Sequence, residues 1–287
     1  MKRHSNAAWW YVAPALAILG FVGLIPLLSV VNYSFFDIFT LESRFWVGTE
    51  WFDELVGSAD LYVTLGRSLL FSGLALLIQF PLGLLIALNI PKNGLGRSIL
   101  LIVLALPLLV PWNMIPGMWL GLIDPELGLL GRIIAGTGIT FDYKFNAVHT
   151  WLLLLAMDTW HWVGLVAILA YSGLSSIPAP YFQAARIDGA RRWAVFRFIQ
   201  LPRLRGVLTM ALVLRIMDSL MIYTEAFGIN AGGPGKATSF LALELGEDIA
   251  AFNYGPAAAR SVLYFLIVLL VAWTMTATLR RHGGTNG

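Results

Sequence analysis

Six long apolar runs, each nearly free of charged residues, limit the fold of this 287-residue chain more than any other feature. A helix needs about 20 consecutive apolar residues to cross the hydrocarbon core of a bilayer, and the runs are of that order. They cover residues 10–33, 69–88, 98–122, 148–174, 204–226 and 261–279. We therefore expect an all-α integral membrane protein with six transmembrane helices.

Composition and loop length support one membrane domain spanning residues 1–287. Hydrophobic residues make up 58% of the chain and charged residues 12%, about half the charged share of an ordinary globular protein. This balance excludes intrinsic disorder. The absence of cysteine excludes a disulfide scaffold and a cysteine-ligated metal site. The loops are too short to hold an additional soluble domain.

The distribution of charge predicts the orientation. Lys and Arg collect in cytoplasmic loops. Here they gather in both tails, in the loop after the second run and in the segment 178–206, which alone has six arginines. The remaining three loops carry acidic residues instead. We expect both termini in the cytoplasm, and the first run is too long for the 7–15-residue apolar core of a cleaved signal peptide.

The sequence has no recognisable catalytic set. Its four histidines are scattered, and neither H-E-x-x-H nor G-x-S-x-G occurs. The segment Gly232–Ala237 resembles a phosphate-binding loop, but Asn230 stands where the first glycine belongs and Ala237 replaces the magnesium-binding Ser or Thr. We expect no catalytic residue, no metal site, no directly bound cofactor and no nucleic-acid partner.

The segment 178–206 is too charged to enter the bilayer. Residues 180–187 predict a short helix that opens with proline and ends at Asp188-Gly189, where glycine can take a positive φ. Residues 190–199 predict a second helix, with an apolar stripe of Trp193, Phe196 and Ile199. Such a pair could lie on anionic lipid or dock a cytoplasmic partner, and the residue pattern alone leaves both possibilities open.

This segment closely resembles the EAA loop of permease subunits of binding-protein-dependent ABC importers. The matching residues are Ala184, Ala185, Asp188, Gly189, Ala190, Phe196, Ile199, Leu201 and Pro202. Gln183 replaces the usual Glu, and Gly206 replaces a common Pro. Further segments are similar to the sugar-type subfamily of maltose and glycerol-3-phosphate permeases: 106–129, 215–224, 232–235 and 253–259.

The resemblance implies a set of partners in a bacterial inner membrane. Two homologous permease subunits would form the pathway, and two ATP-binding subunits would hold ATP and magnesium. A periplasmic or lipid-anchored substrate-binding protein would deliver the solute. The loop would form a cytoplasmic coupling helix between the fourth and fifth spans, contacting the ATPase through Gln183, Ala184, Ala185, Asp188, Gly189 and Ala190.

Ionisable residues inside the spans are costly and are candidates for the translocation pathway. Asp158 and His161 lie three residues apart, hence on one helix face, next to Trp160 and Trp162. Carboxylate, imidazole and indole groups suit the hydroxyls and apolar face of a sugar. Alternatively, Asp158 and His161 could satisfy each other within the bundle.

A second polar stripe lies in the fifth run and consists of Arg215, Asp218, Ile222 and Glu225. Arg215 is near the middle of the run and needs a partner, which Asp218 supplies most directly. We expect a structural ion pair for Arg215, and we assign Asp218, Tyr223 and Glu225 to the pathway. Gln79 in the second run predicts an interhelical hydrogen bond.

These observations predict a permease subunit that forms half of the pathway for a small hydrophilic solute. A sugar, a polyol such as glycerol and a sugar phosphate are the expected classes, and the chain itself would not be an enzyme. The alternative is an ion-coupled secondary transporter in which Asp158, His161 and Asp218 bind protons or ions. Such a transporter has no use for an EAA-like loop.

Overall fold

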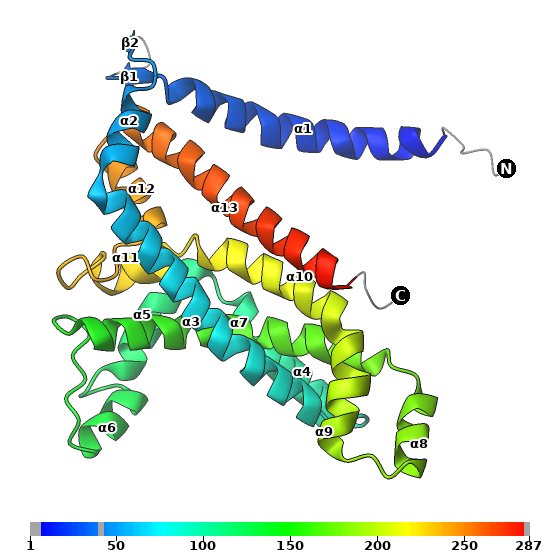
Figure 1. Ribbon diagram of the computed structural model, residues 1–287. Coiled ribbons are helices and arrows are strands. Elements are labelled where there is room, and N and C mark those ends of the chain that lie inside the picture. The colour runs from blue at the N-terminus through cyan, green and yellow to red at the C-terminus, as the bar shows by residue number, and fades with distance from the viewer. Residues whose placement is uncertain (1–6, 40–42, 284–287) are drawn as a thin grey trace. The chain divides into compact units, whose positions relative to one another are not determined.

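The computed structural model (Figure 1) describes residues 7–39 and 43–283. The chain divides into two compact units. Unit 1 comprises Met1–Tyr62 and Glu244–Ile267, and unit 2 comprises Val63–Leu243 and Val268–Gly287. Three helices, α3 (Ala59–Asn89), α12 (Leu241–Ala250) and α13 (Tyr254–Gly283), contribute residues to both units. That residues 1–287 form one membrane domain stays a prediction.

Unit 1 contains a small β-hairpin that the sequence did not predict. The unit's complete elements are α1 (Ala7–Tyr33), β1 (Phe36–Ile38), β2 (Arg44–Trp46) and α2 (Glu50–Gly57). The strands pair antiparallel, with Phe36 opposite Trp46. The two rings meet edge to face at 5.2 Å, and the Trp51 indole donates a hydrogen bond to the Phe36 carbonyl. These two three-residue strands are the exception to the predicted all-α fold.

Acidic residues near the start of α13 are paired within unit 1. Arg260 donates from Nη1 to Glu244 Oε2 and from Nε to Asp248 Oδ2, each at 2.7 Å. The backbone of α13 also approaches β1 closely, because a Cβ added at Gly255 would lie 2.3 Å from the Phe36 carbonyl oxygen. The start of α13 is therefore fixed both to α12 by charge and to the hairpin by close packing.

Unit 2 holds the remaining elements and the main apolar core. Its complete elements are α4 (Leu95–Ala105), η1 (Pro107–Leu109), η2 (Trp112–Met114), α5 (Ile115–Ile123), α6 (Leu129–Gly136), α7 (Ala147–Ser175), α8 (Ala179–Ile187), α9 (Arg192–Val195), η3 (Phe196–Gln200), α10 (Leu201–Ser219) and α11 (Thr224–Asn230). The longest of these, α7, begins where the Asn146 side chain accepts hydrogen bonds from the amides of Val148 and His149.

Four helices in the described residues are long and apolar enough to cross a membrane, and two bent helix pairs bring the total to as many as six. The four continuous candidates are Trp9–Tyr33, Ala59–Asn89, Ala147–Ser175 and Tyr254–Thr278. The first three contain the predicted runs 10–33, 69–88 and 148–174, and the fourth covers all but the last residue of 261–279. Helix α3 starts ten residues before the predicted 69–88. The predicted runs 98–122 and 204–226 coincide with the bent pairs.

Two of the six predicted spans are bent helix pairs, and the other four are continuous helices. The first pair bends by 84° between Leu95–Leu109 and Trp112–Ile123, and the second pair bends by 41° between Arg192–Ser219 and Thr224–Asn230. Pro107 and Pro111 flank the first break, where proline removes backbone donors that a continuous helix needs. The short arms α5 and α11 pack together, since a Cβ at Gly228 would lie 2.5 Å from Pro116 side-chain atoms.

The segment 178–206 folds partly as predicted. Helix α8 follows Pro178 and ends at Ile187, with Asp188 as its C-cap, and Gly189 has φ +65°, as the predicted stop requires. The separate helix predicted over 190–199 is wrong, because Arg192–Ser219 runs on as one helical segment. A π-helical turn, η3, precedes Pro202. This wider turn lets the helix continue past proline, which has no backbone N–H to donate.

Part of the charge pattern behind the predicted orientation lies outside the described residues. Lys2 and Arg3 precede them, and nothing is described of the side chains of Arg280 and Arg281. The orientation of both termini stays a prediction.

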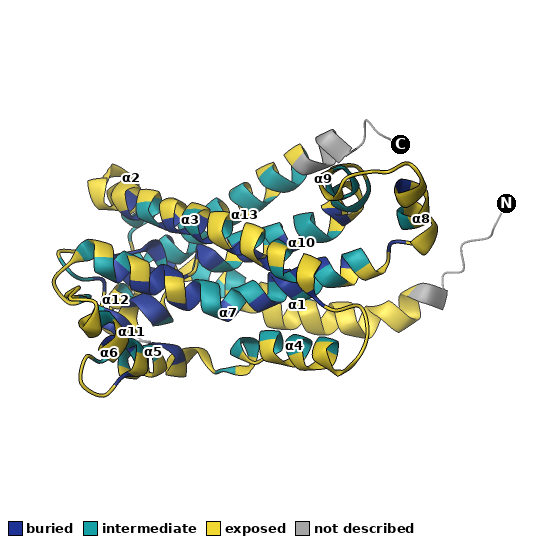
Figure 2. Cartoon of the chain, turned by 90° about the horizontal axis from the view of Figure 1, so that it is seen from below, coloured by how far each residue is buried: buried dark blue, intermediate teal, exposed yellow. Residues whose placement is uncertain are grey.

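Helix α7 is the centre of unit 2. It packs along α10 and also against α4 (Figure 1), and buried residues occur along most of its length (Figure 2). Leu154 and Met157 of α7 are fully buried in one cluster with Phe71 and Phe240. At Gly164 the α4 backbone comes so close that an added Cβ would lie 1.9 Å from the Leu104 carbonyl oxygen.

This contact predicts that Gly164→Ala destabilises the bundle. The new methyl group would force α4 away from α7, which costs about 1–3 kcal/mol for overpacking of this kind. Thermal unfolding of the purified protein in detergent measures the effect. Gly73→Ala is the control, because nothing lies within 4 Å of a Cβ there, and alanine should stabilise that helix position by about 0.5–1 kcal/mol. Equal midpoints for the two variants would contradict the close packing.

Candidate functional site

A fully buried arginine joins three helices in unit 2. Arg215 of α10 donates from Nη2 to Asp158 Oδ2 on α7 at 2.7 Å and from Nε to Gln79 Oε1 on α3 at 2.9 Å. Its Nη1 forms an ion pair with Asp218, one turn along α10. All three guanidinium nitrogens are thus bound. We call Gln79, Asp158, Arg215 and Asp218 the Arg215 network.

Gln79 hydrogen-bonds both Asp158 and Arg215. Its amide nitrogen donates to Asp158 Oδ2 at 2.6 Å while its amide oxygen accepts from Arg215. Gln79 is fully buried, and Asp158 is 4% exposed. The predicted interhelical hydrogen bond is confirmed, and its partners are the two charged groups. An amide suits this position because it offers a donor to the carboxylate and an acceptor to the guanidinium at once.

An aromatic cluster adjoins the Arg215 network. The Arg215 guanidinium carbon lies 4.6 Å from the centre of the Trp162 ring, a favourable position over the ring face. Trp112, at the bend between α4 and α5, contacts the rings of both His161 and Trp162, with centroids 5.0 and 5.6 Å apart. The buried His161 Nδ1 and Trp162 Nε1 make no hydrogen bond within the described residues.

The structure confirms one of the predicted side-chain pairs and contradicts another. The ion pair expected between Arg215 and Asp218 is confirmed. The alternative in which Asp158 and His161 satisfy each other is wrong, because Asp158 is bound by Arg215 and Gln79 while His161 lies among tryptophans. Sequence spacing relates residues only along one helix, whereas the partner of Asp158 comes from a helix 57 residues away.

The predicted pathway residues separate into two groups. Asp158, His161 and Glu225 are at most 4% exposed. Asp218 keeps a side chain that is 30% exposed, and Tyr223 is 37% exposed, its ring stacked on Phe227. Tyr223 lies in the break between α10 and α11, and Glu225 is in the first turn of α11. Only Asp218 and Tyr223 therefore reach the surface of the chain.

The residues predicted to contact an ATPase form an exposed patch on and beyond α8. Gln183, Ala184, Asp188, Gly189 and Ala190 are exposed, and Ala185 alone is buried. The α8 helix ends through hydrogen bonds from the Asp188 and Ala190 amides to the Ala184 and Ala185 carbonyls. A Cβ at Gly189 would meet nothing within 4 Å, so only backbone conformation demands glycine there.

Sequence reasoning missed Trp112 and the link between Asp158 and Arg215. One signal was available for the link, because a lone arginine inside an apolar run needs more counter-charge than one partly exposed carboxylate provides. The prolines at 107 and 111 were a signal for the bend that places Trp112 beside His161. The described residues contain no group of three or more His, Asp and Glu side chains able to hold a metal ion.

A family comparison identifies the chain. Residues 79–282 match the family described as binding-protein-dependent transport system inner membrane component. The chain belongs to this family. Members of the family are permease subunits, so this inner membrane component is a multi-pass transport protein and not itself an enzyme.

Its relatives match over most of their length. The trehalose/maltose transport system permease protein MalF of Thermococcus litoralis is 27% identical over 269 residues, which cover 88% of this chain and 90% of that protein. The sn-glycerol-3-phosphate transport system permease protein UgpA of Agrobacterium fabrum is 29% identical over 238 residues, 81% and 80% of the two chains.

Solved structures show the same fold. A chain of a bacterial ABC transporter involved in the import of the acidic polysaccharide alginate matches with a TM-score of 0.80, at 19% identity and over 96% of this inner membrane component and 95% of that chain. The same TM-score holds for an alginate ABC transporter in complex with an alginate pentasaccharide-bound periplasmic protein. The permease fold is thus shared at low sequence identity.

The Arg215 network predicts different outcomes for its two carboxylates. Asp158→Asn removes the buried counter-charge of Arg215 and should lower the stability of the protein by about 3–5 kcal/mol. Asp218→Asn should cost less than about 1 kcal/mol, because that carboxylate is partly exposed and Asp158 still neutralises the arginine. Thermal unfolding in detergent compares the two. If Asp218→Asn were less stable than Asp158→Asn, Asp218 and not Asp158 would be the main counter-ion of Arg215.

Proposed function

We propose that this chain forms half of the translocation pathway of an ABC importer and is driven by ATP hydrolysed on separate subunits. The solute is a small hydrophilic molecule, namely a sugar, a polyol such as glycerol or a sugar phosphate. The names of the maltose and glycerol-3-phosphate relatives support these classes. The observation that carries the proposal is the short exposed helix α8, ended by a glycine in a left-handed conformation.

The geometry of α8 supports a role in coupling. Its exposed residues Gln183 and Ala184 are free to enter a cleft of an ATPase subunit, while Ala185 is buried within the chain. After the Gly189 turn the chain continues as one helical segment from Arg192 to Ser219. A rigid connection of this kind would carry a displacement of α8 into the bundle.

The partly exposed residues Asp218 and Tyr223 are the better candidates for solute contact. A pathway between two permease subunits needs groups at the surface of each, which these two residues provide. Carboxylate and phenol groups hydrogen-bond hydroxyls, and an aromatic ring packs on the apolar face of a sugar. Asp158, His161 and Glu225 would instead support that surface from within the bundle.

The proposal includes a full set of partners. Two ATP-binding subunits would hold ATP and magnesium, a second homologous permease would complete the pathway, and a periplasmic or lipid-anchored protein would deliver the solute. The periplasmic protein bound in the alginate transporter supports the last of these. The complex would lie in a bacterial inner membrane with both termini of this chain in the cytoplasm.

The alternative of an ion-coupled secondary transporter has less support. Its proton or ion sites would need exchangeable carboxylates, but Asp158 is held by Arg215 and Gln79. His161 lies among Trp112, Trp160 and Trp162.

The turn after α8 provides a test of coupling. Gly189→Val should uncouple ATP hydrolysis from uptake and leave membrane insertion intact, because a β-branched residue is strained at φ +65°. Gly189→Asn is the matched control, since asparagine tolerates this conformation and no atom lies within 4 Å of a Cβ added at this position. ATPase activity and solute uptake are measured in reconstituted vesicles. Normal uptake by Gly189→Val would remove the coupling role from this turn.

The partner set is tested by purifying the tagged protein from native membranes in mild detergent. Mass spectrometry should find an ATPase with Walker motifs and a second permease in the same peak. Recovery of this chain alone, with transport driven by an ion gradient, would refute the importer proposal in favour of the secondary transporter.

A further inference from the structure

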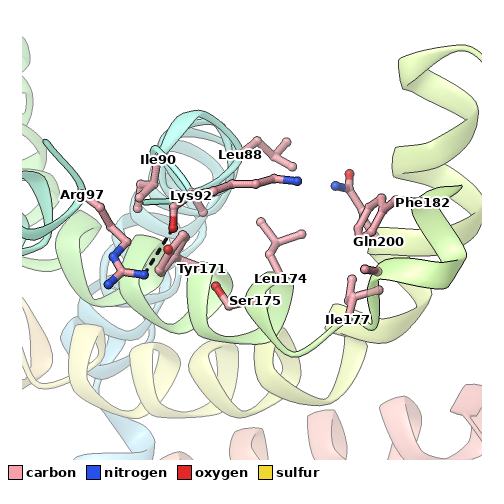
Figure 3. A pocket seen from close by; sticks show the side chains of 12 residues that line it. Leu88, Ile90, Lys92, Arg97, Tyr171, Leu174, Ser175, Ile177, Phe182 and Gln200 are labelled. Atoms are coloured by element: carbon pink, nitrogen blue, oxygen red, sulfur yellow. Dashed lines mark hydrogen bonds between the residues drawn. The ribbon is translucent and has the colours of Figure 1, made fainter. Parts of the chain in front are cut away.

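A basic pocket lies in unit 2 where α3, α4, α7 and α8 approach one another (Figure 3). Its volume is about 400 Å³, within the roughly 300–1,000 Å³ of small-molecule sites. The polar lining consists of Lys92, Arg97, Tyr171, Ser175 and Gln200. None of its lining residues is acidic. We call this cavity the Lys92 pocket.

The polar lining of the Lys92 pocket contains two cationic donors, Lys92 and Arg97, and no carboxylate to pair with them. Figure 3 shows the Lys92 ammonium and the Gln200 amide nitrogen directed towards each other across the pocket, and both are donors. The ammonium lies 5.5 Å from the centre of the Phe182 ring, and its own carbonyl accepts a hydrogen bond from Arg97 Nη1 at 3.2 Å. The Tyr171 and Ser175 hydroxyls also line the pocket, and each can donate a hydrogen bond. An anionic ligand with several acceptor oxygens would satisfy these groups together.

The pocket lies at the ends of candidate membrane spans. Lys92 belongs to the turn between the end of α3 at Asn89 and the start of α4 at Leu95, and Ser175 is the last residue of α7. The ends of spans coincide with the headgroup region of a bilayer, where phosphate groups are concentrated. Basic pockets between helices at this depth bind anionic headgroups.

We propose that the Lys92 pocket binds a phosphate group, supplied by the headgroup of an anionic phospholipid. This site is separate from the Arg215 network and does not depend on the solute carried. Lys92 and Arg97 would neutralise the phosphate, and the Tyr171, Ser175 and Gln200 side chains would donate hydrogen bonds to its oxygens.

A neighbouring cavity favours a lipid over a free phosphate compound. This cavity has a volume of about 1060 Å³ and shares Leu88, Lys92, Phe182 and Gln200 with the Lys92 pocket. Apolar side chains make up much of its remaining lining, among them Leu84, Leu85, Trp193 and Phe196. An acyl chain could lie on this surface while the phosphate occupies the Lys92 pocket. A soluble phosphate would leave the apolar surface uncovered.

Native mass spectrometry of the delipidated complex tests the proposal. It is titrated with phosphatidylglycerol, with phosphatidylcholine of the same acyl chains, and with inorganic phosphate. Phosphatidylglycerol should bind more tightly than the net-neutral phosphatidylcholine. Lys92→Gln should weaken phosphatidylglycerol binding about fivefold, and the double variant with Arg97→Gln about 25-fold, from the usual contribution of a basic residue near a membrane surface.

Three variants separate this site from general charge effects. Lys144→Gln removes the same charge at an exposed position outside the pocket and should bind phosphatidylglycerol normally. Lys92→Arg keeps the charge and should retain binding. Gln200→Leu removes a donor without changing charge and should weaken binding. Thermal midpoints of all variants show whether each protein is folded.

Equal binding of the two lipids, or equal weakening by Lys92→Gln and Lys144→Gln, would overturn the proposal. Lys92-dependent binding of inorganic phosphate without binding of phosphatidylglycerol would overturn the lipid as the source and leave a soluble phosphate compound as the ligand.

Discussion

The fully buried guanidinium of Arg215 is the constraint on which unit 2 depends. A charge inside an apolar bundle costs several kcal/mol unless it is paired and hydrogen-bonded. The bundle meets this requirement by bringing α3 and α7 to α10, through Gln79 and Asp158. Apolar packing alone has little direction in a membrane, where lipid is as apolar as the helices. The network therefore fixes which faces of the three helices meet.

Sequence reasoning predicted what depends on composition and local spacing. The apolar runs follow from composition. Neighbours within about one turn predict the α8 helix, the positive φ of Gly189 and the pair of Arg215 with Asp218. The Asp158 contact could not be predicted in this way, because it needs the packing of α7 on α10. The hairpin at Phe36 was missed for a related reason, since its three-residue strands are stabilised by Trp46 and Trp51 rather than by a long alternating pattern.

The two bent helix pairs also organise unit 2, because their short arms pack against each other. Each bent pair has a long arm, α4 or α10, and a short arm, α5 or α11, and the short arms pack at Pro116 and Gly228. Broken helices leave backbone groups and aromatic side chains at membrane depth, which continuous helices do not. Trp112 at one bend and Tyr223 at the other are examples. Of the two proposed solute contacts, Tyr223 thus lies at a break, while Asp218 belongs to the Arg215 network that joins α3, α7 and the long arm α10.

The unbroken segment from Arg192 to Ser219 has a mechanical consequence. At about 1.5 Å per residue it is roughly 40 Å long, and an α-helix is stiff over that distance. Its first turn follows the exposed α8 patch, and its last turns carry Arg215 and Asp218. A rotation of the first turn about the helix axis would therefore turn the guanidinium against Asp158 and Gln79. The π-helical turn at Phe196–Gln200 is the most easily deformed part of this helical segment. Its torsional stiffness would set what fraction of a rotation at one end of the segment reaches the other end.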